Sequence, residues 1–428
     1  MQKIKKIAVL GASGNMGSLS GGIFAQAGIQ CVYFARSVEK AQAGIDAAVG
    51  QARSDVLRDV ITPRSYDDLE KEIPDCDWIF EGLAEDMNIK NEFFSRIEKV
   101  RKKGSIVSTV SSGLSIRAMA EGRDPDFQAH FMGTHFYNPP GKLLANELIF
   151  HPNVSKDVRK FVTKFCDEVL GRANIVTHDV PAFAGNRIGF QFLNEAALYA
   201  EKYGVEKIDY LLGPYTGRAM PPLATIDLVG LDVHKAIVEN VYANVKDERI
   251  ETYKMPAYMH TMIERGMLGR KARGAGGFFN RDENKNKTVL DISTLSFKPA
   301  EKYKLDWVEK VKGLIYDGLY SAAVDIIKNE PGEEAAIVRH FILGYVSYSY
   351  ARIGEVTPLE DGIHGIDRVM SSGFSWMPAS GWVQLLGGGE ETAKLMVKEK
   401  LPVPAELTKN EKKNKCQIPD ISRFLIGR

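Results

Sequence analysis

Short apolar runs alternate with longer amphipathic segments in the first part of the chain. Four buried strands are predicted, at residues 7–10, 30–34, 77–81 and 105–109. Residues 18–28 follow the first run as a helix that ends on glycine, and residues 85–102 carry apolar side chains at helical spacing. This alternation predicts an α/β fold with an open, parallel sheet.

Helical periodicity replaces this alternation in the second part of the chain. Residues 184–203 form a long, largely apolar segment, which predicts a helix packed inside an all-α domain. A proline-containing loop follows at residues 214–222, and helix resumes at Asp227. The polar run at residues 280–286 is the best candidate for a linker.

The helical pattern then occurs a second time. An apolar helix over residues 337–350 leads to Ile366-Asp367, just as residues 186–203 lead to Ile208-Asp209. We therefore predict two related helical units. The second has no asparagine at the position of Asn186, so we expect it to be structural.

Composition and charge exclude several classes of function. The chain is 44% hydrophobic and 26% charged, with a net charge of +1, so it carries no excess of basic residues for nucleic acid or a membrane surface. No apolar run reaches the roughly 20 residues of a membrane span. The four cysteines lack the paired spacing of a zinc site and are expected to be reduced. We expect a soluble, cytoplasmic protein.

A glycine-rich turn joins the first predicted strand to the helix after it. Gly11, Gly14 and Gly17 are spaced Gly-x-x-Gly-x-x-Gly, with Asn15 and Met16 between the last two. Glycines let backbone N–H groups approach a pyrophosphate at a helix N-terminus, so this context predicts NAD or NADP binding. The spacing is one residue longer than the commonest form, which predicts a wider loop.

The end of the second predicted strand bears on the choice of cofactor. An acidic residue there binds the ribose hydroxyls of NAD, but this chain has Arg36 and Ser37 instead. These side chains suit the 2′-phosphate of NADP. The alternative, held equally, is that Arg36 stacks on the adenine or lies in solvent.

The segment Gly133-Thr-His135-Phe-Tyr-Asn-Pro-Pro carries the candidate chemistry. Glu147 lies twelve positions beyond His135, and a carboxylate within reach holds an imidazole in one tautomer and stabilises its charged form. The alternative is a loop histidine with an unrelated surface glutamate. Ser111 and Ser112 end another strand, where ligands meet a parallel sheet, although loop serines often bond their own backbone.

Several motifs together resemble the 3-hydroxyacyl-CoA dehydrogenase family. They occur in family order over roughly residues 5–280 and are Glu81-Gly-Leu-Ala-Glu85-Asp-Met-Asn-Ile-Lys90, Ser111-Ser112, His135-Phe-Tyr-Asn-Pro139, Glu147, Asp179 to Arg187, Asp227 to Asp232, and Gly269 to Phe279. The resemblance implies a Rossmann-type NAD(P)-binding domain followed by helical C-terminal domains. The expected boundaries are residues 1–180, 181–295 and 296–400, with an exposed tail at 401–428.

The resemblance also implies roles for individual residues. His135 would be the base that accepts the proton of the substrate 3-hydroxyl, and Glu147 would orient it. Ser111 and Asn186 would hydrogen-bond substrate oxygens. Because Gly113 is an extra residue after the serine pair, either Ser111 or Ser112 could face the substrate, and we prefer Ser111.

Two further residues, Glu85 and Lys90, would lie on the cofactor and acyl-CoA sides. The alternatives are structural: Lys90 as a solvated helix lysine, Glu85 as a helix cap, and Asn186 as a cap or bridge between helices.

By resemblance, the expected reaction interconverts (3S)-3-hydroxyacyl-CoA and 3-ketoacyl-CoA with NAD(P), in fatty-acid β-oxidation or related metabolism. The family favours NAD, whereas Arg36 favours NADP. The alternatives are a dehydrogenase of a non-thioester, carnitine-like hydroxy acid and a non-catalytic dinucleotide-binding regulator. A monomer or homodimer is expected, because the second helical unit can cover the face by which single-unit relatives pair. We expect dehydrogenase activity without hydration, because a hydratase domain would not fit in a chain of this length.

Overall fold

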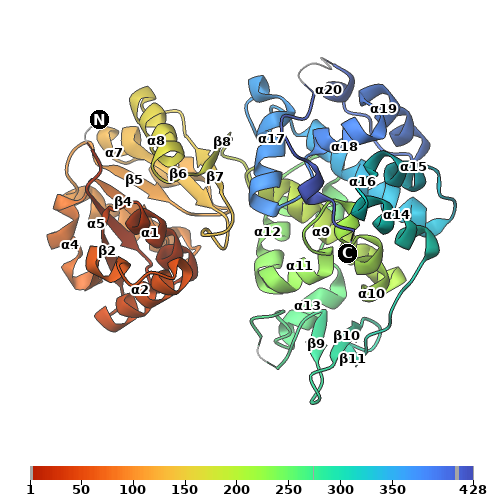
Figure 1. Ribbon diagram of the computed structural model, residues 1–428. Helices are drawn as coiled ribbons and strands as arrows, with labels where there is room; N and C mark the ends of the chain where they lie inside the picture. The colour runs from red at the N-terminus through yellow and green to blue at the C-terminus, as the bar shows by residue number, and fades with distance from the viewer. Residues whose placement is uncertain (1–2, 273, 410–413, 428) are drawn as a thin grey trace. The chain divides into compact units, whose positions relative to one another are not determined.

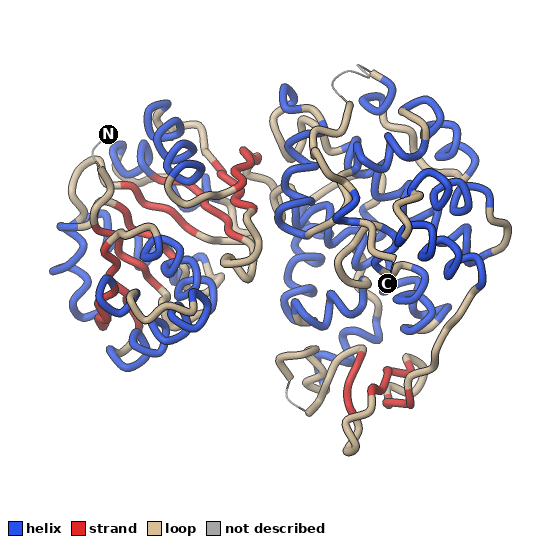
Figure 2. Tube along the Cα trace, in the orientation of Figure 1, coloured by secondary structure: helices blue, strands red, loops and turns tan. Residues whose placement is uncertain are grey.

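The computed structural model describes residues 3–272, 274–409 and 414–427. The chain divides into two compact units, Met1–Phe183 and Ala184–Arg428. The strands of the large sheet lie in the first unit, and helices make up most of the second (Figures 1 and 2). Among the described residues, no helix is long and apolar enough to cross a bilayer.

The first unit is built on one eight-stranded sheet with the order β3-β2-β1-β4-β5-β6-β7-β8. Its strands are β1 Lys6–Leu10, β2 Gln30–Ala35, β3 Ile61–Ser65, β4 Trp78–Glu81, β5 Ile106–Thr109, β6 Phe131–Phe136, β7 Ala145–Ile149 and β8 Ala173–Thr177. Neighbouring strands are parallel except for the antiparallel pair β6 and β7. The predicted α/β fold is confirmed, and each predicted strand is found within one residue at either end.

Both faces of this sheet are buried beneath helices. Successive residues of β1 alternate between two cores, Ile7 and Val9 in one and Ala8 and Leu10 in the other. A parallel sheet covered on both faces needs such nearly continuous apolar strands. The helices are α1 Asn15–Gln26, α2 Val38–Ala52, α3 Leu57–Val60, α4 Leu69–Glu72, α5 Met87–Val100, α6 Ile116–Ala120, α7 Pro125–His130 and α8 Lys156–Glu168.

The second unit is mainly helical. Its helices are α9 Gly185–Tyr203, α10 Val205–Leu211, α11 Pro222–Val229, α12 Leu231–Asn244, α13 Ala257–Glu264, α14 Asp306–Tyr316, α15 Tyr320–Asn329, α16 Glu333–Ala351, α17 Ile363–Val369, α18 Ala379–Leu386, α19 Gly389–Lys398 and α20 Ala405–Thr408. The two long apolar helices predicted from the sequence are α9 and α16.

The polar run at residues 280–286 is not a linker, so that prediction was wrong. It covers the end of β9 (Phe279–Arg281) and the turn into β10 (Lys287–Asp291), which pair antiparallel, and β11 (Ser296–Pro299) adds a third strand. Asp282 closes the turn by accepting a hydrogen bond from the backbone N–H of Asn286 at 2.8 Å.

Matching aspartates support the proposed duplication within the second unit. Asp209 in α10 accepts hydrogen bonds from the backbone N–H groups of Leu223 and Ala224 in α11, at 2.8 and 3.0 Å. Asp367 in α17 likewise accepts one from the backbone N–H of Ser380 in α18, at 3.3 Å. Each carboxylate therefore ties a short helix to the start of the helix that follows it.

These two aspartates predict a pH dependence of folding. Burial raises the pKa of Asp209 and of Asp367 to about 7, from about 3.9 in an unfolded chain. The native state then holds protons that the unfolded state releases, so the free energy of unfolding falls as pH rises from about 4 to about 7. The expected loss is on the order of 3 kcal/mol for each group.

Urea unfolding at several pH values measures this slope. Asp209→Asn with Asp367→Asn should flatten it, because an amide does not titrate. An unchanged slope in the double variant would contradict the assignment.

Candidate active site

His135 and Glu147 face each other across two neighbouring antiparallel strands. The register pairs His135 of β6 directly with Glu147 of β7, and Nδ1 of the imidazole lies 2.6 Å from Oε2 of the carboxylate. His135 is 6% exposed and Glu147 is fully buried. Because Nδ1 faces the carboxylate, Nε2 is the nitrogen that can exchange a proton with a substrate.

Tyr137 completes this pair, and sequence reasoning missed it. Its hydroxyl donates a hydrogen bond to Oε2 of Glu147 at 2.8 Å. The centre of its ring lies 5.0 Å from that of His135, and the centre of the Phe183 ring lies 5.6 Å from that of the imidazole. The signal was present, since residues two apart in an extended segment point to the same side.

A second polar cluster lies just beyond the ends of β4 and β5. Oε1 of Glu85 accepts hydrogen bonds from the Ser111 hydroxyl at 2.7 Å and from the backbone N–H groups of Ser112 and Gly113 at 2.9 and 3.0 Å. Burial raises the pKa of Glu85, but Lys90 and these hydrogen bonds outweigh burial and hold it below its usual value. The inserted Gly113 thus contributes a donor to the cluster.

Asp86, not Glu85, caps helix α5. The Asp86 carboxylate accepts hydrogen bonds from the backbone N–H groups of Asn88 and Ile89, at 2.9 and 3.0 Å. The alternative in which Glu85 serves only as the cap is therefore wrong, and its carboxylate is directed at the serine turn instead.

Lys90 lies beneath this cluster and not in solvent. Its Nζ is 2.8 and 3.0 Å from the two carboxylate oxygens of Glu81 and 3.6 Å from Oε2 of Glu85. The side chains of Lys90 and Glu81 are both fully buried. Glu81 also accepts hydrogen bonds from the Thr109 hydroxyl and from the backbone N–H of Leu83. This ion pair joins β4, β5 and α5 under the candidate site.

The glycine turn packs too tightly for side chains at two of its three glycines. A Cβ atom on Gly11, where φ is +73°, would lie 2.1 Å from the carbonyl oxygen of Gly82, and one on Gly17 would lie 2.3 Å from the carbonyl oxygen of Gly11. Gly14 has room, since the nearest atom to its Cβ would be 3.4 Å away. The hydroxyl of Tyr66, another residue missed from the sequence, accepts a hydrogen bond from the Gly11 N–H at 3.1 Å.

The turn fits a dinucleotide pyrophosphate. Gly14 is the N-cap of α1, no side chain caps that helix, and its first turn has no acidic residue. The first-turn N–H groups, which include Asn15 and Met16, and the positive end of the helix dipole therefore suit an anion. Arg36, which is exposed, and Ser37 follow β2 directly, at the edge where a cofactor ribose would lie.

The contrast between glycines makes a stability prediction. Gly17→Ala should lower the free energy of unfolding by about 2–3 kcal/mol, because the new methyl group clashes with backbone atoms of Gly11 that cannot move without distorting the turn. Gly14→Ala should cost less than about 1 kcal/mol. Urea unfolding of the two variants without cofactor tests this, and equal losses would show that the turn is looser than described.

In the second unit, Asn186 is the second residue of α9 and is 7% exposed. The N-cap position of that helix is held by Ala184, so Asn186 is not its cap. The guanidinium of the next residue, Arg187, is fully buried and lies 2.6 Å from Asp247 and 2.9 Å from Glu355. The start of α9 is therefore fixed by charged groups from later in the chain.

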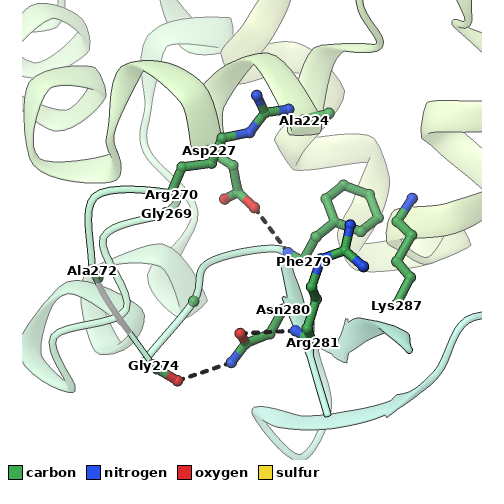
Figure 3. Close-up of a pocket in the computed structure, with 11 residues that line it drawn as sticks. Ala224, Asp227, Gly269, Arg270, Ala272, Gly274, Phe279, Asn280, Arg281 and Lys287 are labelled. Carbon is green, nitrogen blue, oxygen red and sulfur yellow. Dashed lines mark hydrogen bonds between the residues drawn. The ribbon is translucent and has the colours of Figure 1, made fainter. Parts of the chain in front are cut away.

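Two motifs that are separate in the sequence, Asp227 to Asp232 and Gly269 to Phe279, contact each other in the second unit and form one joint (Figure 3). The Asp227 carboxylate accepts hydrogen bonds from the backbone N–H groups of Phe278 and Phe279, at 2.8 and 2.9 Å. The backbone carbonyl of Asp227 accepts a hydrogen bond from the backbone N–H of Arg270 at 2.8 Å. A Cβ atom on Gly277 would lie 2.1 Å from that carboxylate. Burial raises the pKa of Asp227 to about 6. The joint borders a cavity of about 590 Å³.

Two family models match consecutive parts of the chain. The model described as the NAD binding domain of 3-hydroxyacyl-CoA dehydrogenase matches residues 6–180, and the model of the C-terminal domain matches residues 183–278. Together they include both polar clusters, the glycine turn and Asn186.

Curated relatives agree with these models. A probable 3-hydroxyacyl-CoA dehydrogenase of Deinococcus radiodurans is 33% identical over 313 residues, which cover 70% of this chain and 88% of the relative. A probable 3-hydroxyacyl-CoA dehydrogenase of Bacillus subtilis is 34% identical over 322 residues, covering 74% of this chain but only 39% of the relative.

A solved structure shares the fold of nearly the whole chain. The 3-hydroxybutyryl-CoA dehydrogenase of Escherichia coli has a TM-score of 0.68 at 17% identity, with 97% of each chain covered. The likeness therefore extends beyond residue 278 into the region of the second helical unit.

Proposed function

Because the chain belongs to the 3-hydroxyacyl-CoA dehydrogenase family, we propose that it interconverts (3S)-3-hydroxyacyl-CoA and 3-ketoacyl-CoA thioesters with NAD(P), in acyl-CoA β-oxidation or related metabolism. The observation that carries the proposal is the buried pair of His135 and Glu147, with Nδ1 and Oε2 2.6 Å apart. A protein that only binds a dinucleotide has no chemical need for an imidazole oriented in this way.

In this proposal His135 moves the proton. Its Nε2 accepts the proton of the 3-hydroxyl during oxidation and returns it during reduction. Glu147 holds the ring in one tautomer and stabilises the charged imidazolium. NAD(P), when bound, accepts or returns the hydride.

The other residues hold substrate and cofactor. We place Ser111 and Asn186 at substrate oxygens, with Ser112 as the alternative to Ser111. The Ser111 hydroxyl donates to Glu85 at 2.7 Å and accepts from the Leu114 N–H at 3.1 Å, so it would have to turn its proton from Glu85 to the substrate to donate to a substrate oxygen. Glu85 lies beside it on the cofactor side, and Lys90 holds the charge of Glu85 in place.

For the cofactor, Gly11, Gly14 and Gly17 would shape the turn around the pyrophosphate. The N–H groups of the first turn of α1 would contact its oxygens. The family description supports NAD, whereas Arg36 and the missing carboxylate at the end of β2 support NADP. We propose that Arg36 admits NADP by pairing with its 2′-phosphate.

A nicotinamide-absorbance assay with acetoacetyl-CoA tests both proposals, with NADH and NADPH run side by side. Turnover with the thioester but not with free acetoacetate is expected. Arg36→Ala should lower kcat/KM for NADPH by about tenfold and leave that for NADH nearly unchanged. Turnover of the free acid alone would favour a non-thioester substrate, and equal effects on both cofactors would remove Arg36 from their discrimination.

We further propose a cytoplasmic enzyme that is a monomer or a homodimer, with an acyl-CoA substrate and neither nucleic acid nor a membrane as a partner. All four cysteines are free thiols, which suits a reducing compartment. Light scattering after size-exclusion chromatography measures the oligomeric state. Tight dimers alone would mean that the second helical unit does not replace a partner.

A further inference from the structure

The hydroxyl of Tyr137 lies on the same carboxylate oxygen as the candidate base. Oε2 of Glu147 accepts the Tyr137 hydroxyl at 2.8 Å, while Nδ1 of His135 lies 2.6 Å from the same atom. Tyr137 is 7% exposed and Glu147 is fully buried. Two hydrogen-bonding groups therefore share one buried anionic oxygen.

The surroundings of this oxygen come from three segments of the first unit. His135 and Tyr137, two titratable groups that hydrogen-bond to the carboxylate, lie in β6 and directly after it. On the other side β8 places Ile175 opposite Glu147 in the parallel register, and Phe183 packs on the imidazole. With apolar neighbours there, hydrogen bonds to the carboxylate are stronger than they would be in water.

Tyr137 remains a donor at every working pH. Burial, and then the charge of Glu147, raise the pKa of its hydroxyl well above the usual value for tyrosine. The phenol proton is therefore kept on the oxygen and directed at the carboxylate.

We propose that Tyr137 is a positioning residue that fixes the Glu147 carboxylate and limits how strongly this carboxylate stabilises the charged form of His135. The proposal rests on the proposed function. A donor that is always present stabilises the carboxylate whether or not the imidazole is charged. It thereby reduces the extra stabilisation that Glu147 gives to the imidazolium, so removing the hydroxyl should shift the pH profile of the reaction.

Tyr137→Phe tests this by removing only the hydroxyl. In the oxidation direction the base must be unprotonated, so activity is expected to rise with pH. The midpoint of that limb of kcat/KM should move up by about one pH unit, because the imidazolium then gains the full charge of Glu147. Below the midpoint the rate should fall about tenfold. KM for the thioester should change less than about twofold, since Tyr137 is given no contact with substrate.

Tyr258→Phe is the matched control. Its buried hydroxyl donates to the backbone carbonyl of Ala197 at 2.9 Å in the second unit. It should lower the melting temperature about as much as Tyr137→Phe and leave the pH limb in place. In a Glu147→Gln background, Tyr137→Phe should no longer move the limb, because the charge through which it acts is gone.

The outcomes separate this proposal from the one on which it rests. A limb that does not move in an active, folded Tyr137→Phe protein would overturn the positioning role and leave the dehydrogenase intact. The same shift in the Glu147→Gln background would also overturn it, because Tyr137 would then act by another route. A wild-type protein inactive on thioesters would instead refute the proposed function.

Discussion

Replacing His135 with glutamine should lower turnover of acetoacetyl-CoA by about 10³–10⁴-fold, while the dissociation constant of the cofactor changes less than about threefold. Glutamine can hydrogen-bond to Glu147 but cannot carry a proton to or from the substrate oxygen. The glycine turn that we assign to the cofactor lies between other segments, β1 and α1. The affinity of the variant for the cofactor should therefore be retained. Steady-state kinetics and cofactor titration measure the two quantities.

His130→Gln is the matched control for that experiment. His130 ends α7, directly before β6, and its Nδ1 lies 2.7 Å from the backbone carbonyl of Asp126. This substitution should leave turnover within about twofold of the wild type, because nothing in the proposed mechanism passes through it. Equal loss of turnover and of cofactor binding in His135→Gln would make His135 a structural residue.

Replacing Lys90 with methionine should lower the free energy of unfolding by about 3–5 kcal/mol. The substitution leaves the fully buried carboxylate of Glu81 without its cation, and water cannot reach that carboxylate to compensate. The loss should also disturb the cofactor side of the site, since Lys90 lies 3.6 Å from Glu85. Urea unfolding, with the pH held constant, measures the effect.

Lys102→Met is the control, because Lys102 pairs with Asp77 at the surface and its side chain is 38% exposed. That pair should contribute less than about 1 kcal/mol. Adding Glu81→Gln to Lys90→Met should restore part of the stability, because it removes the unpaired charge. Equal small losses in Lys90→Met and Lys102→Met would mean that Glu81 is not the buried anion described above.

The sequence predicted the parts of the site that depend on local pattern. Apolar runs and glycines lie next to one another in the chain, so the glycine turn at Gly11 and the first strand before it followed directly. The pairing of His135 with Glu147 was also within reach, because a short hairpin brings residues twelve apart into register.

Contacts that depend on packing between distant segments were not predicted. Lys90 reads as an ordinary helix lysine, and only the approach of α5 to β4 buries it against Glu81. Tyr66 reaches the Gly11 N–H from 55 residues away. The polar run at residues 280–286 was wrongly predicted to be a linker, because a hairpin turn and a linker have the same polar composition. Only the pairing of β9 with β10 distinguishes them.

The central claim is tested most directly by the stoichiometry of one reaction. The purified chain is mixed with acetoacetyl-CoA and reduced cofactor, and oxidised cofactor and 3-hydroxybutyryl-CoA are both quantified. We predict one molecule of each for every turnover with the wild type, and neither above background with His135→Gln. The contradicting result is a wild-type protein that oxidises no cofactor when the thioester is added, although the cofactor still raises its melting temperature. The chain would then bind a dinucleotide without carrying out this reaction.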